Sequence, residues 1–495
     1  MTDTNVSGTL MSLVTGDSDR CEPFEIATTI GGERFVGNEW MTVYSPYSGE
    51  PVASVPVCGP AEVDRAFKKA QERLGDKLPQ HERARILTTA AELMRGRVNE
   101  FARILSLEAG KPVRTARGEV ERCIDTLRLS AAEALALSGE VIPMDASSSG
   151  VGRIGFALRV PIGVVAAITP FNFPLNLVAH KVAPAIAAGC PVVLKPAPAT
   201  PLSALAFAEL LAECGLPSGW LSIVTGPAPN LGEQLISHPI PRLISFTGSV
   251  PVGWSIAAAA PRKRVCLELG ANSPVIIEAS ADVPDAARRV VTAAFGFSGQ
   301  SCISVQRVLV HRSVAAEFID QARQRAASLV VGDPLDEQTD VGPVINAVAA
   351  TRIMDCISAA ELAGATVLTG GITDGNIVRP TILSNVGLHS DVWRTEVFGP
   401  VMAIQIYDDL DSAFSLANDS DFGLHVGVFT NDLTSALRAV KELDFGGVLI
   451  NDVPTARFDQ QPYGGLRDSG NTREGPRYTV HEMTELRFVS LATQS

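Results

Sequence analysis

Residues 163–195 read GVVAAITPFNFPLNLVAHKVAPAIAAGCPVVLK, and this stretch decides the fold. The apolar run at 163–168 predicts a buried strand, 174–189 predicts a helix, and 191–195 predicts a second strand. The alternation continues, with short helices between, in the apolar runs 221–226, 242–248 and 264–270. Short apolar strands that alternate with helices are typical of a parallel, doubly wound α/β sheet covered on both faces. Such sheets bind ligands at the carboxyl ends of their strands.

The segments before and after residues 163–270 differ in the spacing of their apolar residues. Before it, apolar residues recur at helical spacing through 60–74, 81–110 and 117–139. The stretch 152–165 alternates like a hairpin, and such a ribbon outside the main sheet is a candidate oligomerisation element. After Ser273 a second α/β segment follows, and the chain ends in a strand predicted at 485–492.

The bulk composition describes a globular chain with net negative charge. Its 495 residues are too many for one ordinary core, so two or three domains are expected. Hydrophobic residues make up 46% and charged residues 19%, which argues against a disordered chain. With 41 basic and 54 acidic residues, the net charge of −13 argues against nucleic acid or an anionic membrane as a partner.

The cysteines and the first 20 residues indicate the cellular compartment and whether a metal site is expected. No two of the eight cysteines form a CxxC pair or lie at zinc spacing from a histidine. We therefore expect reduced thiols, a cytoplasmic protein and no metal site. Residues 1–20 lack the features of a signal or transit peptide and are expected to form a mobile tail. The apolar stretch 163–179 is short for a membrane span and is interrupted by Pro170 and Pro174.

Cys302 stands in FGFSGQSCISVQR (295–307), between a predicted helix and a predicted strand. Free cysteines are usually buried apolar residues, and seven of the eight are interpreted that way. The polar turn before Cys302 favours a nucleophile there, with its backbone N–H facing a substrate. Because Cys302 follows a helix instead of preceding one, no helix N-terminus can lower its pKa. A nucleophilic Cys302 therefore needs a base.

Two polar residues stand at or just beyond strand ends. Glu268 in LELG ends an apolar strand, where a carboxylate is costly unless it has a partner or a task. It is either a salt-bridged strand-end residue or the base that Cys302 needs. Asn172 in TPFNFPLN follows the first strand, where its amide could donate to an oxyanion. The alternative is that Asn172 caps the helix that begins near Pro174.

Two other strand ends suggest a nucleotide. Lys195 in VVLKP lies where an ammonium could hold a nucleotide hydroxyl or phosphate. The segment FTGSVPVG contributes Gly248, Ser249 and Gly253, and the helix behind it would favour the negative charge of a pyrophosphate. This segment is not the GxGxxG fingerprint, and alone it is a weak motif.

Taken together, these segments make the sequence similar to the aldehyde dehydrogenase superfamily. PFNFP, LKPA, FTGS, LELG, GQSC and EVFGP occur in the family's order and spacing, and the similarity extends from about residue 25 to residue 490. The resemblance is greatest to members that act on lactaldehyde, on glyceraldehyde 3-phosphate without phosphorylation, or on phosphonoaldehydes.

The resemblance implies an α/β fold with a Rossmann-like doubly wound parallel sheet, a second α/β catalytic domain and a small β oligomerisation element. It predicts a dinucleotide-binding domain at 21–142 and 163–270 and a catalytic domain at 271–475. The oligomerisation element is predicted at 143–162 and 476–495. This hairpin and the last strand are expected to pair across subunits of a homodimer or homotetramer, covering exposed edges.

The resemblance also implies residue roles. Cys302 resembles the nucleophile, Glu268 the general base, and the Asn172 amide with the Cys302 backbone N–H the oxyanion hole. The implied cofactor is NAD or NADP, with Lys195 at the adenosine ribose and Ser249 at the pyrophosphate. The full set of expected cofactor-binding residues is Thr169, Pro170, Phe171, Lys195, Gly248, Ser249, Gly253, Leu269, Glu396 and Phe398.

The implied reaction oxidises an aldehyde to a carboxylic acid through a thiohemiacetal and a thioester, which water releases. A coenzyme A-acylating enzyme is the first alternative, and Glu268 argues against it because relatives of that kind tend to lack this base. A non-catalytic binding protein of the same fold is the second, and the intact set of Cys302, Glu268 and Asn172 argues against it.

Five residues bear on the substrate. Arg122 and Arg457 resemble positions that hold an anion in non-phosphorylating glyceraldehyde-3-phosphate dehydrogenases, and an arginine pair suits carboxylate, phosphate or phosphonate. The alternative is that Arg122 pairs with Glu119 or Glu121 and Arg457 with Asp459 as ordinary ion pairs. Phe173 and Phe458 are expected to form apolar walls of the substrate tunnel, and the alternative for Phe173 is ordinary core packing. Ser301 stands where some relatives of this kind have arginine.

The sequence departs from many NAD-using relatives after Lys195. Those relatives have glutamate three residues on, where it can bind the ribose 2′-hydroxyl, and this chain has Pro198. No carboxylate repels a 2′-phosphate there, so the preference between NAD and NADP stays open.

Overall fold

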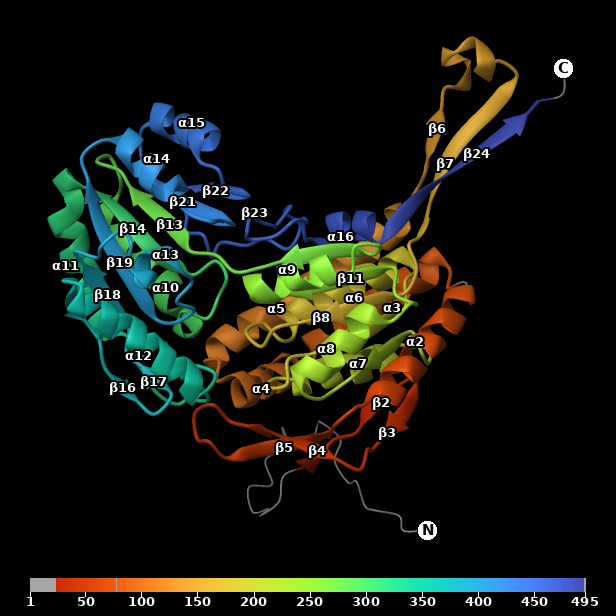
Figure 1. Cartoon of the computed structure of the whole chain (residues 1–495), viewed down its shortest axis with the longest axis horizontal. Helices are drawn as coiled ribbons and strands as arrows, with labels where there is room; N and C mark the ends of the chain where they lie inside the picture. The colour runs from red at the N-terminus through yellow and green to blue at the C-terminus, as the bar shows by residue number, and fades with distance from the viewer. Residues whose placement is uncertain (1–23, 77, 494–495) are drawn as a thin grey trace.

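The segment that decides the fold forms β8 (Val165–Ile168), α6 (Asn176–Ala188) and β9 (Val192–Lys195), as predicted. The structure is a computed structural model that describes residues 24–76 and 78–493. The tail predicted at residues 1–20 lies outside the described residues. Figure 1 shows two α/β lobes side by side and a long ribbon that projects from one of them.

The first lobe contains a five-stranded parallel sheet in the order β10-β9-β8-β11-β12. The chain runs outward from β8 through β9 to β10, then returns to the other side of β8. The strand order therefore reverses between β8 and β11, which is where such sheets bind ligands. The remaining strands of this sheet are β10 (Leu221–Ile223), β11 (Leu243–Thr247) and β12 (Arg264–Glu268).

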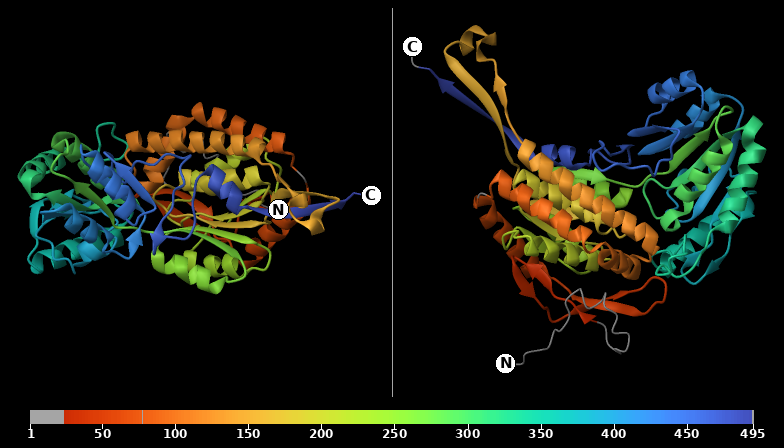
Figure 2. Two further views of the ribbon diagram at one scale, coloured as in Figure 1. Left: turned by 90° about the horizontal axis from the view of Figure 1, so that it is seen from above. Right: turned by 180° about the vertical axis from the view of Figure 1, so that it is seen from behind.

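Both faces of this sheet are buried, which confirms the doubly wound prediction. Val165 and Ala167 of β8 pack into a core with one group of helices, whereas Val164 and Ala166 pack into a core with the other. The first group is α3 (Gln80–Arg95), α4 (Val98–Ala109), α5 (Val113–Ala136), α6 and α7 (Leu202–Glu213). The second is α2 (Pro60–Gly75), α8 (Ala228–Ser237) and α9 (Val250–Ala259). Figure 2 shows the first group lying across the back of the sheet.

The second lobe contains a seven-stranded sheet in the order β15-β18-β19-β14-β13-β21-β22, parallel except for β15. Its strands are β13 (Ser273–Ile277), β14 (Val305–His311), β15 (Thr366–Thr369), β18 (Thr381–Ser384), β19 (Val401–Tyr407), β21 (His425–Phe429) and β22 (Gly447–Ile450). One face packs on α10 (Val283–Phe295) and α11 (Arg312–Ser328). The other packs on α12 (Ala347–Leu362), α13 (Asp391–Arg394), α14 (Leu410–Asn418) and α15 (Leu433–Glu442).

The remaining strands form small sheets. A three-stranded sheet and a hairpin precede α2, made of β1 (Phe24–Glu25), β2 (Thr28–Ile30), β3 (Glu33–Phe35), β4 (Trp40–Tyr44) and β5 (Pro51–Pro56). Two further short pairs are β16 (Thr373–Asp374) with β17 (Ile377–Val378), and β20 (Phe422–Gly423) with β23 (Leu466–Arg467).

The projecting ribbon consists of β6 (Glu140–Ile142), β7 (Arg153–Pro161) and β24 (Thr484–Ala492). β24 pairs with β7 of its own chain along their full lengths, and the pairing of this ribbon across subunits stays a prediction. Helix α16 (Pro476–Glu482) leads directly into β24 and delivers it to the edge of β7. The division of the chain into three domains stays a prediction.

Candidate active site

The polar residues predicted at the strand ends of the first sheet gather at one edge. Lys195 ends β9 in register with Ile168 of β8, and Glu268 ends β12 in register with Thr247 of β11. Asn172 lies in the turn between β8 and α6. Because all five strands are parallel, these side chains come from the same, carboxyl-terminal edge.

Cys302 lies in a tight turn between α10 and β14, where the second lobe faces that edge. The turn is possible because Phe297, Ser298 and Gly299 all adopt positive φ, at 49°, 55° and 68°. A Cβ on Gly299 would lie 2.1 Å from the carbonyl oxygen of Gly399, so only glycine fits there. Burial raises the pKa of the Cys302 thiol to about 11, so the neutral thiol predominates near pH 7 and a base must take its proton.

Asn172 is buried and points at the turn that carries Cys302. Its Nδ2 donates to the carbonyl oxygen of Gln300 at 3.0 Å, and its Oδ1 has no partner among the described residues. The alternative that Asn172 caps the following helix is wrong, because α6 begins only at Asn176. The first N–H groups of that helix, on Leu175 and Asn176, donate instead to the Glu119 carboxylate at 3.0 and 3.1 Å.

Glu268 is also buried, and it is not salt-bridged. Neither of its carboxylate oxygens has a hydrogen-bond partner among the described residues, so the ion-pair alternative is wrong. Burial and the nearby charge of Glu474 raise its pKa well above the usual range. The negative charges of Glu268 and Glu396 both raise the pKa of Cys302, which places the predicted base and a predicted cofactor residue close to the nucleophile.

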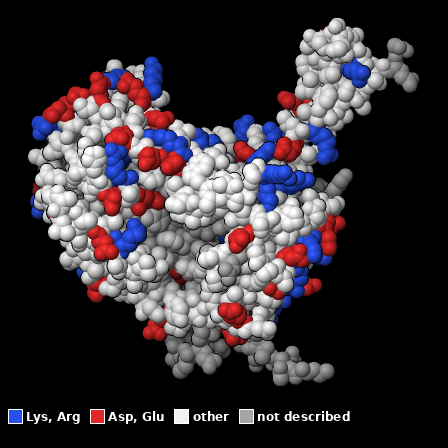
Figure 3. All heavy atoms as spheres, viewed as in Figure 1, with Lys and Arg blue, Asp and Glu red and all other residues white. Residues whose placement is uncertain are grey.

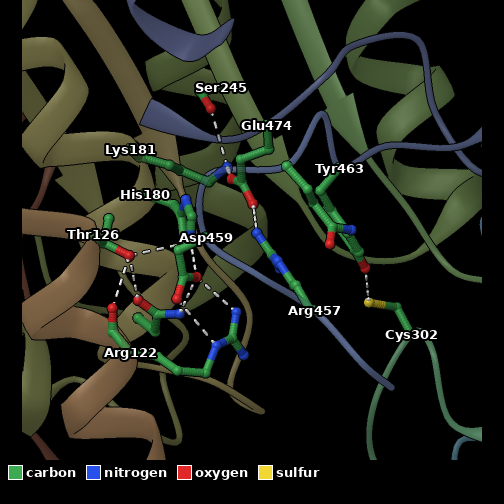
Figure 4. A network of polar contacts seen from close by, with 12 residues as sticks. Arg122, Thr126, His180, Lys181, Ser245, Cys302, Arg457, Asp459, Tyr463 and Glu474 are labelled. Carbon is green, nitrogen blue, oxygen red and sulfur yellow. Dashed lines mark hydrogen bonds and ion pairs between the residues drawn. The ribbon is translucent and has the colours of Figure 1, made fainter. Parts of the chain in front are cut away.

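The two halves of the predicted catalytic set face different cavities. Cys302 lines a pocket of about 560 Å³, and Glu268 lines a small neighbouring cavity with Lys181 and Glu474. The loop residue Gly464 lies between them, because a Cβ on it would be 3.0 Å from Oε1 of Glu268. The preceding residue, Tyr463, reaches the other side and its hydroxyl lies 2.9 Å from the Cys302 sulfur (Figure 4).

Four of the five predicted substrate residues line the Cys302 pocket, namely Arg122, Phe173, Ser301 and Arg457. Phe458 is not among the lining residues, and it is 58% exposed. Phe173 is held edge-on to Phe297, with the Lys111 ammonium 3.8 Å from the Phe173 ring centre. Lys111 is itself fully buried and paired with Glu119.

Both arginines are ion-paired, but with partners other than those predicted. Arg122 donates to Asp459, by Nη2 at 2.8 Å and Nε at 3.3 Å, and not to Glu119 or Glu121. Arg457 donates to Glu474 at 2.6 Å and not to Asp459. The reason is the fold, since Glu119 is already committed to the start of α6. Arg457 keeps a buried Nε without a partner among the described residues, and both arginines line the Cys302 pocket.

Asp459 is the centre of a buried network that sequence reasoning missed (Figure 4). Its Oδ1 accepts from Nε2 of His180 at 2.8 Å and from Nδ2 of Asn176 at 3.3 Å, in addition to Arg122. Burial raises the pKa of Asp459, but the hydrogen bond from His180 and the charge of Arg122 outweigh burial, so the carboxyl stays ionised. The network ties the loop after β22 to α5 and α6.

The predicted cofactor residues form a second group on the same edge. Lys195 is buried, its Nζ donates to the carbonyl oxygen of Pro196 and to no other group in the described part of the chain, and burial lowers its pKa to about 8. An unpaired buried ammonium suits a ligand that brings hydroxyl or phosphate oxygens. Nearby, the Oγ1 of Thr169 is buried without a partner in the described chain. Pro170 follows it in the same turn.

The start of α9 offers backbone donors for a pyrophosphate. Ser249 precedes the helix, and its side chain makes no cap to the first turn. A Cβ on Gly253 would lie 2.3 Å from Leu269, and one on Gly248 would lie 2.5 Å from the Phe246 ring, so both glycines allow the close packing of this turn.

Glu396 and Phe398 close the group from the second lobe. Oε1 of Glu396 accepts from the Ala271 N–H at 3.0 Å, and burial raises the pKa of this carboxyl to about 7. Phe398 adopts a positive φ of 48° and packs edge-on against Phe171. These residues fit a dinucleotide, with an ammonium for the ribose, a helix start for the pyrophosphate and a carboxylate for the second ribose. The individual roles stay predictions.

Two other properties concern metals and membranes. Among residues 24–76 and 78–493, no three His, Cys, Asp or Glu side chains gather in a way that could hold a metal ion. Every helix in the described part of the chain is too short or too polar to cross a lipid bilayer. On the face shown in Figure 3, acidic and basic side chains are mixed.

Comparison with known proteins agrees with this geometry. The model of the aldehyde dehydrogenase family matches residues 35–489. A 3-sulfolactaldehyde dehydrogenase of Priestia megaterium is 44% identical over 463 residues, covering 92% of this chain and 97% of the relative. Aldehyde dehydrogenase 21 of Physcomitrella patens, solved with the reaction product succinate, superposes with a TM-score of 0.93 at 37% identity, covering 95% of this chain and 99% of that one.

A third comparison concerns the cofactor. The glyceraldehyde-3-phosphate dehydrogenase GapN of Methanocaldococcus jannaschii, solved with NADP, superposes with a TM-score of 0.88 at 37% identity, covering 92% of this chain and 100% of that one. The fold, the gathered motif residues and these similarities agree. The chain belongs to the aldehyde dehydrogenase family and is an NAD(P)-dependent oxidoreductase that acts on an aldehyde.

Proposed function

We propose that this enzyme oxidises a short aldehyde bearing a second, anionic group, and releases the acid by hydrolysis of a cysteine thioester. One observation carries the proposal: Arg122 and Arg457 line the same pocket as Cys302. A pocket with the nucleophile and two guanidinium groups suits a substrate with an aldehyde at one end and an anion at the other.

The first half of the reaction uses Cys302 and Asn172. The Cys302 thiolate attacks the aldehyde carbon to give a thiohemiacetal, whose oxyanion needs donors. One N–H of the Asn172 amide is held by the Gln300 carbonyl, which fixes the amide and leaves its second N–H free for that oxygen. NAD(P)⁺, when bound by the residues around Lys195 and Glu396, supplies the hydride acceptor that turns the thiohemiacetal into a thioester.

The second half uses Glu268. A buried carboxylate without hydrogen-bond partners is free to accept a proton from a water molecule that attacks the thioester. The same residue argues against coenzyme A as the acyl acceptor, since a bound thiol would not need it. Glu268 also lines a small cavity together with Lys181 and Glu474, and these two groups can relay the proton that Glu268 takes from water out of that cavity.

Three relatives favour an anionic substrate. The names of the similar proteins contain sulfolactaldehyde, the product succinate and glyceraldehyde 3-phosphate, and each of these molecules carries an acidic group. The ion pairs of Arg122 and Arg457 do not oppose this, because each arginine has five donors and spends one or two of them on its carboxylate.

The test compares aldehydes that differ only in the anion. Succinate semialdehyde against butanal, and 3-sulfolactaldehyde against lactaldehyde, should each favour the anionic member by more than about tenfold in kcat/KM, roughly 1.4 kcal/mol. Arg122→Gln should remove most of that preference and leave the neutral aldehydes unchanged.

Arg97→Gln is the matched control, because Arg97 forms a bidentate ion pair with Glu213 outside the pocket. Equal rates for both members of each pair would refute the anionic substrate. A requirement for coenzyme A in turnover would refute the hydrolytic route.

We also propose a homo-oligomer formed through the ribbon, and a cytoplasmic location. Residues directly opposite one another on antiparallel strands share a face, so Val141, Phe156 and Val489 lie on one face of the ribbon. Ile154 and Leu491 lie on the same face, and both are more than half exposed. The ribbon shows few charged side chains in Figure 3. Seven unpaired cysteines in the described chain fit a reducing compartment.

A further inference from the structure

Among the described residues, Tyr463 is the side chain that hydrogen-bonds to the Cys302 thiol. Its hydroxyl lies 2.9 Å from the Cys302 sulfur, well within hydrogen-bonding distance for a sulfur atom. The tyrosine is buried, and its backbone is fixed by hydrogen bonds to Glu474 in both directions. The ring therefore has little freedom to turn the hydroxyl away from Cys302.

The environment of the ring makes the hydroxyl a donor. The guanidinium carbon of Arg457 lies 3.7 Å from the ring centre, and His425 packs edge-on at 5.1 Å. The positive charge of Arg457 acts to lower the pKa of the phenol, which makes its O–H a stronger hydrogen-bond donor. Burial raises the pKa of Tyr463 well above its usual range, so the phenol keeps its proton at any working pH. A protonated phenol beside a sulfur atom stabilises the thiolate more than the thiol.

We propose that Tyr463 is a further catalytic residue, whose hydroxyl donates a hydrogen bond to the Cys302 thiolate and holds it in the attacking position. The proposal rests on Cys302 being the nucleophile, as set out under the proposed function. Tyr463 forms no covalent bond and exchanges no proton in this role. When the sulfur attacks the aldehyde, negative charge moves to the substrate oxygen and the hydrogen bond to sulfur weakens.

Several charges act on the same thiol. Arg457 stabilises the thiolate, whereas Glu268 and Glu396 oppose it, and burial is the largest effect of all. Removing the Tyr463 hydroxyl changes none of these other groups, since Tyr463→Phe keeps the ring on which Arg457 rests. The substitution therefore isolates the hydrogen bond.

The experiment measures alkylation of Cys302 by iodoacetamide across pH, without substrate or cofactor, resolved by peptide mass spectrometry because Cys356 is also partly accessible. A hydrogen bond to a charged group is worth roughly one pKa unit, so Tyr463→Phe should raise the apparent thiol pKa by about one unit and slow alkylation about tenfold on the acid side. On the alkaline side the variant should react as fast as the wild type or faster, because a thiolate without the hydrogen bond is the stronger nucleophile.

Tyr407→Phe is the matched control, since Tyr407 is also buried and its hydroxyl donates to the Ile277 carbonyl in the second sheet. It should leave the alkylation profile unchanged. A Tyr463→Phe profile that superposes on the wild type, or that is faster at every pH, would overturn the proposal. Because no aldehyde is used, an error in the proposed substrate class would leave this profile untouched.

Discussion

Glu268 is a buried carboxylate with no hydrogen bond to either oxygen, an expensive arrangement that no described partner offsets. Its raised pKa means that the ionised form, which alone can act as a base, forms at higher pH than it does for an exposed glutamate. The rate of thioester hydrolysis should therefore rise with pH and reach its plateau at higher pH than an exposed glutamate would give. The free-energy cost of burying the Glu268 carboxylate is explained by a role in activating the water that attacks the thioester.

Glu268→Gln should separate the two halves of the reaction. The variant should still give about one reduced cofactor per active site, formed more slowly because Cys302 loses a base for its proton, followed by steady turnover at least about a hundredfold slower. Stopped-flow absorbance of the reduced nicotinamide measures both phases. Cys302→Ser should abolish burst and turnover together. If Glu268→Gln loses the burst as well, thioester formation itself requires Glu268.

Lys195 gives a pH dependence of the opposite sign. Burial lowers its pKa to about 8 in the free enzyme, so the ammonium loses its charge as the pH rises through that value. The affinity for NADP, which brings a 2′-phosphate, should be constant below about pH 8 and should fall up to tenfold per pH unit above it. Titration of cofactor fluorescence between about pH 7 and about pH 9.5 measures this.

Lys195→Met is the control for that titration, because it should bind NADP weakly with no dependence on pH in this range. Affinity of the wild type that stays constant to about pH 9.5 would show that Lys195 does not contact the phosphate, or that the phosphate holds it charged.

At the scale of elements, Asp459 fastens the loop after β22 to two helices of the other lobe. It accepts hydrogen bonds from Arg122 on α5 and from Asn176 and His180 on α6. Because Arg122 reaches the pocket from this anchor, Asp459 acts as a positioning residue for the predicted anion site.

Asp459→Asn should weaken both the fold and the substrate preference. Leaving Arg122 and its neighbours without a buried negative partner should cost about 3 kcal/mol of unfolding free energy, measured by chemical denaturation. The kcat/KM for the anionic aldehyde should fall more than that for its neutral match. Asp408→Asn, which breaks an exposed ion pair with Arg312, should change neither. A uniform loss for both aldehydes would refute the positioning role.

The same elements show what a sequence can and cannot predict. Glu268, Lys195 and Asn172 could be placed together because a parallel sheet brings all its strand ends to one edge, whatever separates them in the chain. The partner of Arg122 could not be predicted. Asp459 is 337 residues away in the chain, and it lies beside Arg122 only because of the way the two lobes pack together. Tyr463 stands six residues after Arg457, a predicted substrate residue, but nothing in the sequence indicates that its hydroxyl turns to Cys302.

At the scale of the molecule, the pocket belongs to both lobes. Arg122 and Phe173 come from the first lobe, whereas Cys302 and Arg457 come from the second. The distance between the nucleophile and Arg122 of the predicted anion site therefore depends on how the two lobes are held relative to each other. The buried network around Asp459 crosses the junction between the lobes, and the network around Glu119 lies beside it.

The ribbon bears on how many copies of the chain work together. It stands clear of the body in Figures 1 and 2, and its apolar face is exposed in a single chain, with Val141 at 82%. Exposed apolar strands are a hazard unless another surface covers them. A second copy of the chain is the cover that we propose.

Val141→Asp should break that assembly, because it puts a charge on the exposed apolar face that Val141 forms with Phe156 and Val489. Sedimentation velocity should show the wild type as a dimer or tetramer and the variant as smaller species, with association weakened at least about a hundredfold. Leu362→Asp is the control, since Leu362 is 91% exposed on α12, away from the ribbon. A wild type that sediments as a monomer at micromolar concentration, or a Val141→Asp variant of unchanged mass, would show that the ribbon does not hold the copies together.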